Sequence, residues 1–250
     1  MAVESFKIDF HNGHVAQAVR LEAEADPKEA LSALNLHMGH PTIVIMGGAG
    51  AMETEQMQRL QHLIDHGLTK FAEETGIAIV DGGTQAGVMA LIGGSRLWHG
   101  YTFPLIGVAP EALIQYPLFA NPNAAAELDH GHSHFVLTSG TNWGDESEML
   151  AGIGAELAQK EHHKVLGLVI NGGSVVKAEA HARATSALQF PQAFFEGSGR
   201  FADEVATALR AQTSEDPVIQ EIIEAPQSMI IPSGITADEL RAWLEAYFAQ

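Results

Sequence analysis

The stretch from Pro41 to Gly50, PTIVIMGGAG, places an apolar and largely β-branched run directly before a glycine turn. A continuous apolar run of this length predicts a strand buried on both faces, as in parallel sheets. Glycine at the end of such a strand lets the chain turn sharply and lets another group approach the backbone closely. The segment Glu53–Glu74 follows with apolar residues at helical spacing, so it is predicted as a helix.

The same alternation continues along the chain and decides the fold class. Further strands are predicted at Ile77–Val80, Pro104–Val108, Phe135–Thr138, Val165–Ile170 and Ala193–Phe195. Further helices are predicted at Gln85–Trp98, Glu146–His162, Val175–Leu188 and Arg200–Ala211. Buried strands that alternate with amphipathic helices are typical of sheets covered by helices on both faces. We therefore expect an α/β fold with a doubly wound, mostly parallel, Rossmann-like sheet.

This core is expected over residues 41–211, with an extension at each end. Residues 1–40 hold a predicted strand at Phe6–Phe10 and a predicted helix at Pro27–Leu36, with Asp26 as its N-cap. Residues 212–250 end in a predicted helix at Ala237–Phe248, which Thr236 would cap. No repeat and no convincing linker divides the sequence, so a single domain is expected over residues 1–250.

The charge balance limits the partners. Asp and Glu number 31 and Lys and Arg number 13, which gives a formal net charge of −18. Nucleic acids and anionic membranes are bound mainly through Lys and Arg, so neither is an expected partner. No Lys or Arg occurs between Arg96 and Lys160. A small-molecule partner is expected, and any phosphate on it would be held mostly by backbone N–H groups.

The composition also limits compartment and cofactor. The absence of cysteine excludes disulfides and thiol nucleophiles. No apolar stretch reaches the ~18 residues of a membrane span, and Met1–His14 lacks the apolar region of a signal peptide. The turn Gly47–Met52 has Glu53 where a dinucleotide fingerprint has its third glycine, and no P-loop occurs. We expect a cytoplasmic protein without a cofactor.

Glycine turns follow most of the predicted strands and form the candidate binding site. Ligands of open α/β sheets bind at the carboxyl ends of the strands, where turn amides and helix N-termini attract anions. The turn Gly197–Arg200 (GSGR) is the strongest anion candidate, because it precedes a helix and Arg200 adds a guanidinium. Asp203 and Glu204 follow in the first helical turn, where complementing the helix dipole is a sufficient role for them.

Histidines occupy every second position from His130 to His134. On a strand, such residues share one face and could hold a metal ion, but Gly131 places the first of them in a loop. Histidines satisfied by hydrogen bonds are the favoured interpretation, and no metal site is expected. His162–His163 is interpreted as a pair at a helix C-terminus.

Taken in order, these motifs resemble the SLOG superfamily of Rossmann-like nucleotide-ligand domains. The branch that looks most similar is the one at the N-terminus of melastatin-type TRP channels, in its free-standing prokaryotic form. The resemblance is carried by PTIVIMGGAG at Pro41–Gly50, DGGTQAGVM at Asp81–Met89, IGVAPE at Ile106–Glu111, LDHGHSHFVL at Leu128–Leu137, VINGG at Val169–Gly173 and EGSGRFADEVA at Glu196–Ala206. It extends from about Arg20 to Leu209.

The resemblance implies a soluble sensor or binding module for a nucleotide-derived, ADP-ribose-like small molecule. Its phosphates would be held by glycine turns at the strand ends, and the base or ribose would lie under the loop Tyr116–Gly131. The ligand-binding residues that it implies are Gly47, Gly48, Gly82, Gly83, Thr84, Gly87, Ala109, Pro110, Ser139, Gly140, Thr141, Gly172, Gly173, Gly197, Ser198, Gly199 and Arg200.

The superfamily is also similar to the LOG-type phosphoribohydrolases, which cleave the base–ribose bond of nucleoside monophosphates. Their GGGxxGxM turn is largely met at Gly82–Met89, but their PGGxGTxxE turn is met only in part, with Asp203 where the catalytic Glu is expected. The alternative hypothesis is therefore a nucleotide N-glycosidic hydrolase that uses Asp203 and Glu204. A second alternative is a non-binding scaffold or oligomerisation domain. Related folds commonly form dimers, so a homo-oligomer, dimeric or higher, is expected.

Overall fold

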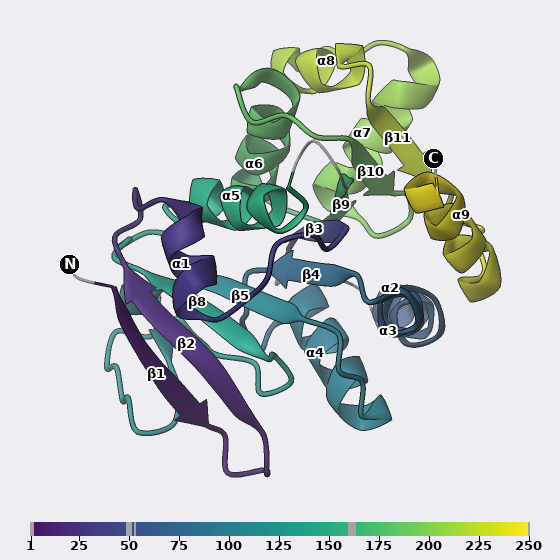
Figure 1. Ribbon diagram of the computed structural model, residues 1–250. Helices are drawn as coiled ribbons and strands as arrows, with labels where there is room; N and C mark the ends of the chain where they lie inside the picture. The colour runs from purple at the N-terminus through teal and green to yellow at the C-terminus, as the bar shows by residue number, and fades with distance from the viewer. Residues whose placement is uncertain (1–2, 49–51, 53, 160–163, 250) are drawn as a thin grey trace.

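A computed structural model describes residues 3–48, 52, 54–159 and 164–249. In this part of the chain, one sheet is formed by β1 (Glu4–Asp9), β2 (Val15–Leu21), β3 (Thr42–Gly47), β4 (Ala78–Asp81), β5 (Leu105–Pro110), β8 (His134–Thr138), β9 (Val165–Ile170), β10 (Gln192–Phe195) and β11 (Ser228–Ile231). The strand order is β1-β2-β8-β5-β4-β3-β9-β10-β11 (Figure 1). The β1–β2 pair is antiparallel and the other pairs in the sheet are parallel.

Helices cover both faces of this sheet (Figure 1). One face carries α1 (Pro27–Ala33), α5 (Ser147–Leu157), α6 (Ser174–Thr185), α7 (Arg200–Ala211) and α8 (Pro217–Glu224). The other carries α2 (Thr54–Leu63), the π-helical turn η1 (Ile64–Leu68), α3 (Thr69–Thr75), α4 (Gly87–His99) and α9 (Ala237–Ala249). The predicted α/β, doubly wound and mostly parallel fold is confirmed. No helix among the described residues is long and apolar enough to cross a membrane.

Strand β3 contributes side chains to the apolar cores on both faces of the sheet. Its side chains alternate, with Val44 and Met46 in the core under α5 and α6, and Ile43 and Ile45 in the core under α2 to α4. All four are at most 2% exposed. Complete burial of an aliphatic side chain stabilises a fold by about 1.5–3 kcal/mol. The central strand therefore connects two apolar cores, which explains its continuous apolar sequence.

The helix predicted over Glu53–Glu74 is interrupted by the π-helical turn η1. Thr69 is fully buried there, and its hydroxyl donates to Ile64 O at 2.9 Å. The same hydroxyl is 2.8 Å from the hydroxyl of Ser95 in α4. A side chain that bonds within its own helix and to a neighbouring helix stabilises the wider turn. The apolar spacing alone gave no indication of this interruption.

Strands β2 and β11 and helix α8 were not predicted from the sequence. Strand β2 forms a hairpin with β1 and joins the sheet next to β8. Helix α8 and strand β11 extend the opposite edge. Asp216 caps α8 by accepting from the backbone N–H groups of Val218 and Ile219. The same Asp-Pro signal, Asp26–Pro27, correctly predicted the start of α1, so α8 was detectable in the sequence.

The long segment Tyr116–Gly131 is anchored by a short parallel pair, β6 (Ile114–Gln115) with β7 (Ala126–Glu127), which follows the 3-10 turn η2 (Glu111–Leu113). Two sequence-based interpretations concern residues that the structure does not describe. They are the third-glycine comparison at Glu53 and the assignment of His162–His163 to a helix end.

His132 is fully buried between two aspartates and ties β4 to the segment before β8. Its Nε2 is 2.8 Å from Asp81 Oδ1 and its Nδ1 is 2.9 Å from Asp129 Oδ1. Burial by itself would lower the pKa of His132, but the charge of Asp81 and the hydrogen bonds of both carboxylates raise it to about 9. His132 is therefore a buried imidazolium held by two carboxylates at neutral pH.

The neighbouring histidines have separate partners. His134 Nδ1 is 2.8 Å from Ser133 Oγ, and burial lowers the pKa of His134 to about 4. His130 Nδ1 is 3.3 Å from Gln85 Nε2. Across the described ranges, no group of three His, Asp or Glu residues has the arrangement of a metal site.

The buried His132 predicts a specific pH dependence of stability. Its folded-state pKa lies above the ordinary value of 6.5, so its stabilising contribution is complete below pH 6.5 and is lost as the pH rises through about 9. Urea unfolding should show wild type more stable than His132→Gln by several kcal/mol at pH 6, since one pKa unit corresponds to about 1.4 kcal/mol. The difference should shrink above pH 9. An equal difference at pH 6 and pH 10 would contradict the charged state assigned to His132.

Two adjacent glycines of α4 provide a matched test of packing around Asp129. A Cβ on Gly93 would lie 1.7 Å from Asp129 Oδ1, whereas a Cβ on Gly94 meets nothing within 4 Å. Gly93→Ala should therefore lower the free energy of unfolding by about 2 kcal/mol or more, because it displaces a buried carboxylate. Gly94→Ala should raise it by up to ~1 kcal/mol through helix propensity alone. Equal effects of the two variants in urea unfolding would refute the close approach.

Candidate functional site

The order of the sheet reverses between β3 and β9. After β3, the chain adds β4 and β5 on one side of β3. Strands β9 and β10 lie on the other side of β3. In open α/β sheets, ligands bind at this point, where the strand order reverses. The turns after the two strands are in close contact, since a Cβ on Gly48 would lie 2.8 Å from Gly172 N. Glycine at position 48 is what allows this approach.

A cavity of about 400 Å³ opens at the carboxyl ends of these strands, and we call it the switch-point cavity. It is lined by Ile45, Gly47, Gly48, Gly82, Thr84, Ala86, Met89, Ala125, Ala126, Trp143, Glu146, Leu150, Gly173, Ser174, Val175, Val176, Glu179 and Arg200. This volume lies within the ~300–1,000 Å³ range of small-molecule sites.

Six of the ligand-binding residues predicted from the sequence meet around this cavity. They are Gly47, Gly48, Gly82, Thr84, Gly173 and Arg200. The other predicted positions lie near the same edge of the sheet without lining the cavity. These are Gly83, Gly87, Ala109, Pro110, Ser139, Gly140, Thr141, Gly172, Gly197, Ser198 and Gly199.

The turn Gly197–Arg200 already has an internal anion. Asp203 Oδ1 accepts from Gly197 N at 2.6 Å, and Asp203 Oδ2 accepts from Gly199 N at 3.1 Å. The hydroxyl of Ser198 donates to a backbone carbonyl of its own turn, at Phe195. A phosphate at these amides would have to displace Asp203. Both oxygens of Asp203 hold the turn, while Glu204 is exposed and lines none of the described cavities.

Two further predicted turns are closed in the same way. Asp145 Oδ2 accepts from Thr141 N at 2.8 Å, and hydrogen bonds to this turn lower the pKa of Asp145. Asp81 Oδ1 accepts from Gly83 N at 2.7 Å. These amides are therefore satisfied by carboxylates of the chain itself, and they are not open to a ligand anion.

Helices α4 and α6, in contrast, begin at the switch-point cavity without a side-chain cap. Ala86, the residue before α4, and Gly173, the residue before α6, both line it. The first N–H groups of a helix have no intrahelical acceptor, and the helix dipole adds partial positive charge there. The two helix starts therefore direct donors and positive potential into one cavity.

Arg200 adds a full positive charge beside the start of α6. A Cβ on Gly173 would lie 2.8 Å from Arg200 Nη2, so the guanidinium rests against the Gly173 backbone. The side chain is exposed and forms no hydrogen bond or ion pair within the described part of the chain. Its φ of 52° is uncommon for a residue other than glycine.

Two carboxyl groups in the cavity were not predicted from the sequence. Burial raises the pKa of Glu146, whose Oε2 accepts from Gly144 N at 2.7 Å. Burial also raises the pKa of Glu179 to about 7, against the opposing hydrogen bond from Ser147. Both lie near or within α5 and α6, where a single Glu has no distinguishing sequence signal.

The doubly wound sheet, with a cavity at its switch point and uncapped helix N-termini around it, defines a Rossmann-like α/β domain. The chain belongs to the family described as SLOG in TRPM, prokaryote, whose model matches residues 40–241. The resemblance inferred from the sequence motifs is thereby confirmed.

The curated relatives that this chain matches are transient receptor potential channels. The chain is 28% identical over 241 residues to transient receptor potential cation channel subfamily M member 7 of Homo sapiens, covering 83% of this chain and 13% of the channel. It is 23% identical over 276 residues to a transient receptor potential channel of Caenorhabditis elegans, covering 97% and 14%. Against subfamily M member 2 of Rattus norvegicus the identity is 26%, covering 80% and 16%. The chain thus spans only about a seventh of these proteins.

The role of Asp203 in its turn is open to a direct test. Asp203→Ala removes the acceptor of two backbone N–H groups and should lower the free energy of unfolding by about 1–2 kcal/mol. The matched control, Glu204→Ala, removes an exposed carboxylate one position further and should change it by less than about 0.5 kcal/mol. Urea unfolding of both variants provides the measurement. An unchanged Asp203→Ala protein would show that the carboxylate does not hold the turn.

Proposed function

We propose that this chain is a binding module for a nucleotide-derived, ADP-ribose-like small molecule, and that its phosphates occupy the switch-point cavity. The observation that carries the proposal is the convergence of two uncapped helix starts, those of α4 and α6, with the exposed guanidinium of Arg200. Backbone amides, helix dipoles and a guanidinium are the groups by which proteins commonly hold phosphate.

The acidic lining is compatible with an anion in this cavity. Burial raises the pKa of Glu146, and it raises the pKa of Glu179 to about 7. A neutral carboxyl can donate a hydrogen bond, and it does not repel a phosphate as a carboxylate does. Below about pH 7, Glu179 is thus mostly neutral and does not repel a phosphate in the cavity.

Intact binding is favoured over hydrolysis by the position of the proposed catalytic pair. Asp203 is committed to two turn amides, and Glu204 is exposed away from the switch-point cavity. A general acid or base must reach the bond that breaks, and neither residue lines the space where that bond would lie. A scaffold role gives no reason for an unpaired arginine beside an uncapped helix start.

The channel relatives favour a sensing role. These relatives are transient receptor potential channels, and this chain matches a small part of each. We propose that the shared segment supplies ligand recognition, and that a ligand changes the contacts of this module with another protein or a second copy of itself. The positive groups of the cavity support a small molecule carrying phosphate as the ligand in that step.

Arg200→Ala tests the phosphate site. In a thermal-shift titration, wild type should be stabilised by ADP-ribose, because a ligand that binds only the folded state raises the unfolding temperature. Loss of a charge-assisted hydrogen bond should weaken binding about tenfold or more in Arg200→Ala. Lys28→Ala, a control on α1 that removes one positive charge outside the described cavities, should bind as wild type does.

Chromatography of the recovered ligand completes the test. Unchanged ADP-ribose after prolonged incubation supports a binding module, whereas release of free adenine supports the N-glycosidic hydrolase. Wild-type affinity in Arg200→Ala would place the phosphate elsewhere, and indifference to every nucleotide derivative would support the scaffold.

A further inference from the structure

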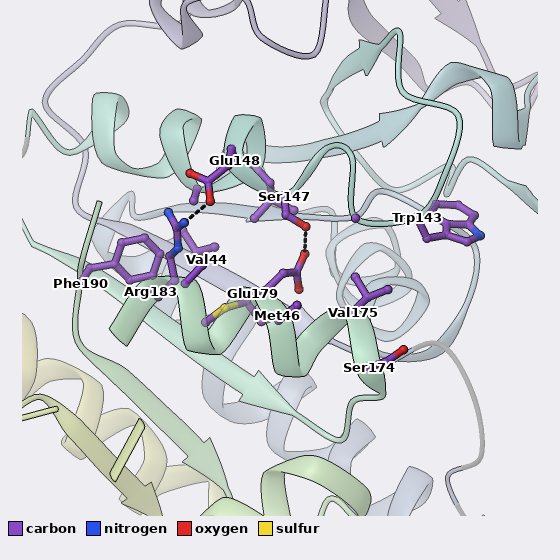
Figure 2. A pocket seen from close by; sticks show the side chains of 15 residues that line it. Val44, Met46, Trp143, Ser147, Glu148, Ser174, Val175, Glu179, Arg183 and Phe190 are labelled. Carbon is purple, nitrogen blue, oxygen red and sulfur yellow. Dashed lines mark hydrogen bonds and ion pairs between the residues drawn. The ribbon is translucent and has the colours of Figure 1, made fainter. Parts of the chain in front are cut away.

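A second cavity continues from the first, between α5 and α6 and over β3 (Figure 2). This α5–α6 groove has a volume of about 400 Å³. It is lined by Val44, Met46, Trp143, Gly144, Ser147, Glu148, Leu150, Ala151, Ser174, Val175, Ala178, Glu179, Ala182, Arg183 and Phe190. It shares Trp143, Leu150, Ser174, Val175 and Glu179 with the switch-point cavity. A molecule bound by its phosphate at the start of α6 therefore has a connected space beside it.

The groove exists because the two helices present small side chains to each other. Ala178 and Ala182 line it from α6, and Ser147 and Ala151 line it from α5. Its floor and end are apolar, formed by Val44 and Met46 of β3 and by the ring of Phe190. Apolar walls with a few polar groups are typical of sites for flat organic molecules.

One of those polar groups is Glu179, which points into the groove from α6 (Figure 2). Its Oε1 accepts from Ser147 Oγ at 2.7 Å. Its second oxygen has no hydrogen-bond partner among the residues that the structure describes. Glu179 therefore has an acceptor to offer to a ligand.

The other polar group is Arg183, one helical turn beyond Glu179. Arg183 is only 3% exposed, and its Nη2 donates a hydrogen bond to Glu148. Its Nη1 is buried and has no hydrogen-bond partner in the described part of the chain. A buried guanidinium nitrogen without an acceptor is costly, and a ligand acceptor in the groove would satisfy it.

We propose that the α5–α6 groove holds the base of the nucleotide, with Glu179 accepting an N–H of the base and Arg183 donating to a neighbouring base acceptor. This inference rests on the proposed function and names the specificity residues of the same site. The edges of nucleobases present N–H donors and N or O acceptors side by side, which matches one acceptor and one donor on successive turns of α6. The loop Tyr116–Gly131, under which the base was expected, contributes only Ala125 and Ala126 to the switch-point cavity.

The titration of Glu179 gives this site a pH signature. Burial raises the pKa of Glu179 to about 7, the hydrogen bond from Ser147 opposes this, the charge of Glu146 adds to it, and Arg183 opposes it. Glu148 also faces the groove, paired with Arg183. Because a base N–H is bound best by the charged carboxylate, the affinity advantage of the nucleotide over ribose 5-phosphate should increase as the pH rises from 6 to 8.

Calorimetric titration separates the two parts of the site. The probes are ribose 5-phosphate, which has no base, and the 5′-monophosphates of adenosine, guanosine, cytidine and uridine. At least one nucleotide should bind about tenfold or more tightly than ribose 5-phosphate, because it adds hydrogen bonds and apolar contact. Ala182→Met fills the groove and should remove this advantage while leaving ribose 5-phosphate binding unchanged. Thr185→Met, on the same helix outside the described cavities, should behave as wild type.

Glu179→Gln provides the second readout. It should weaken the preferred nucleotide about tenfold and abolish the increase in affinity between pH 6 and 8. Retained binding of ribose 5-phosphate shows that a variant is folded.

The outcomes distinguish the two proposals. If ribose 5-phosphate binds as tightly as every nucleotide, or if Ala182→Met keeps the nucleotide advantage, the base site is overturned and the phosphate site stands. If ribose 5-phosphate, the four nucleotides and ADP-ribose all fail to bind, the proposed function fails and the base site fails with it.

Discussion

Each backbone N–H group at the end of a buried strand needs an acceptor. How that need is met decides which turns of this sheet are closed by the chain itself and which are left open. The chain is acidic, and it uses its own carboxylates. Asp203 accepts from the turn before α7, Asp145 from the turn after β8, and Asp81 from the turn after β4. An anion from solution competes poorly with a carboxylate that is already tethered in place. Among the described residues, the starts of α4 and α6 have no such side-chain cap, and both lie at the switch-point cavity.

Most of the fold could be predicted from the sequence, because buried parallel strands are encoded by continuous apolar runs. The bounds of β9 and α7 match the predicted Val165–Ile170 and Arg200–Ala211. Strand β2 was missed because its sequence, VAQAVRL, interleaves polar residues as a strand at the side of a sheet does. The π-helical turn was missed because it depends on Thr69 meeting Ser95 of another helix, which no local pattern records.

The site was predictable only in its backbone part. Glycines after β3, β4 and β9 indicated where the backbone is open to close approach, and Gly47, Gly82 and Gly173 do line the cavity. The sequence could not show that Asp203 reaches back to the amides of its own turn. Nor could it single out Glu179 among 31 acidic residues, since its setting depends on how closely α5 and α6 approach.

The two strands that frame the switch-point cavity come from opposite halves of the chain. Strand β3 follows the N-terminal hairpin, whereas β9 is reached only after β4, β5 and β8 have been added on the far side. Contacts between distant segments form late and slowly during folding, because a long loop must be closed first. The cavity is therefore expected to form only after both halves of the sheet have come together.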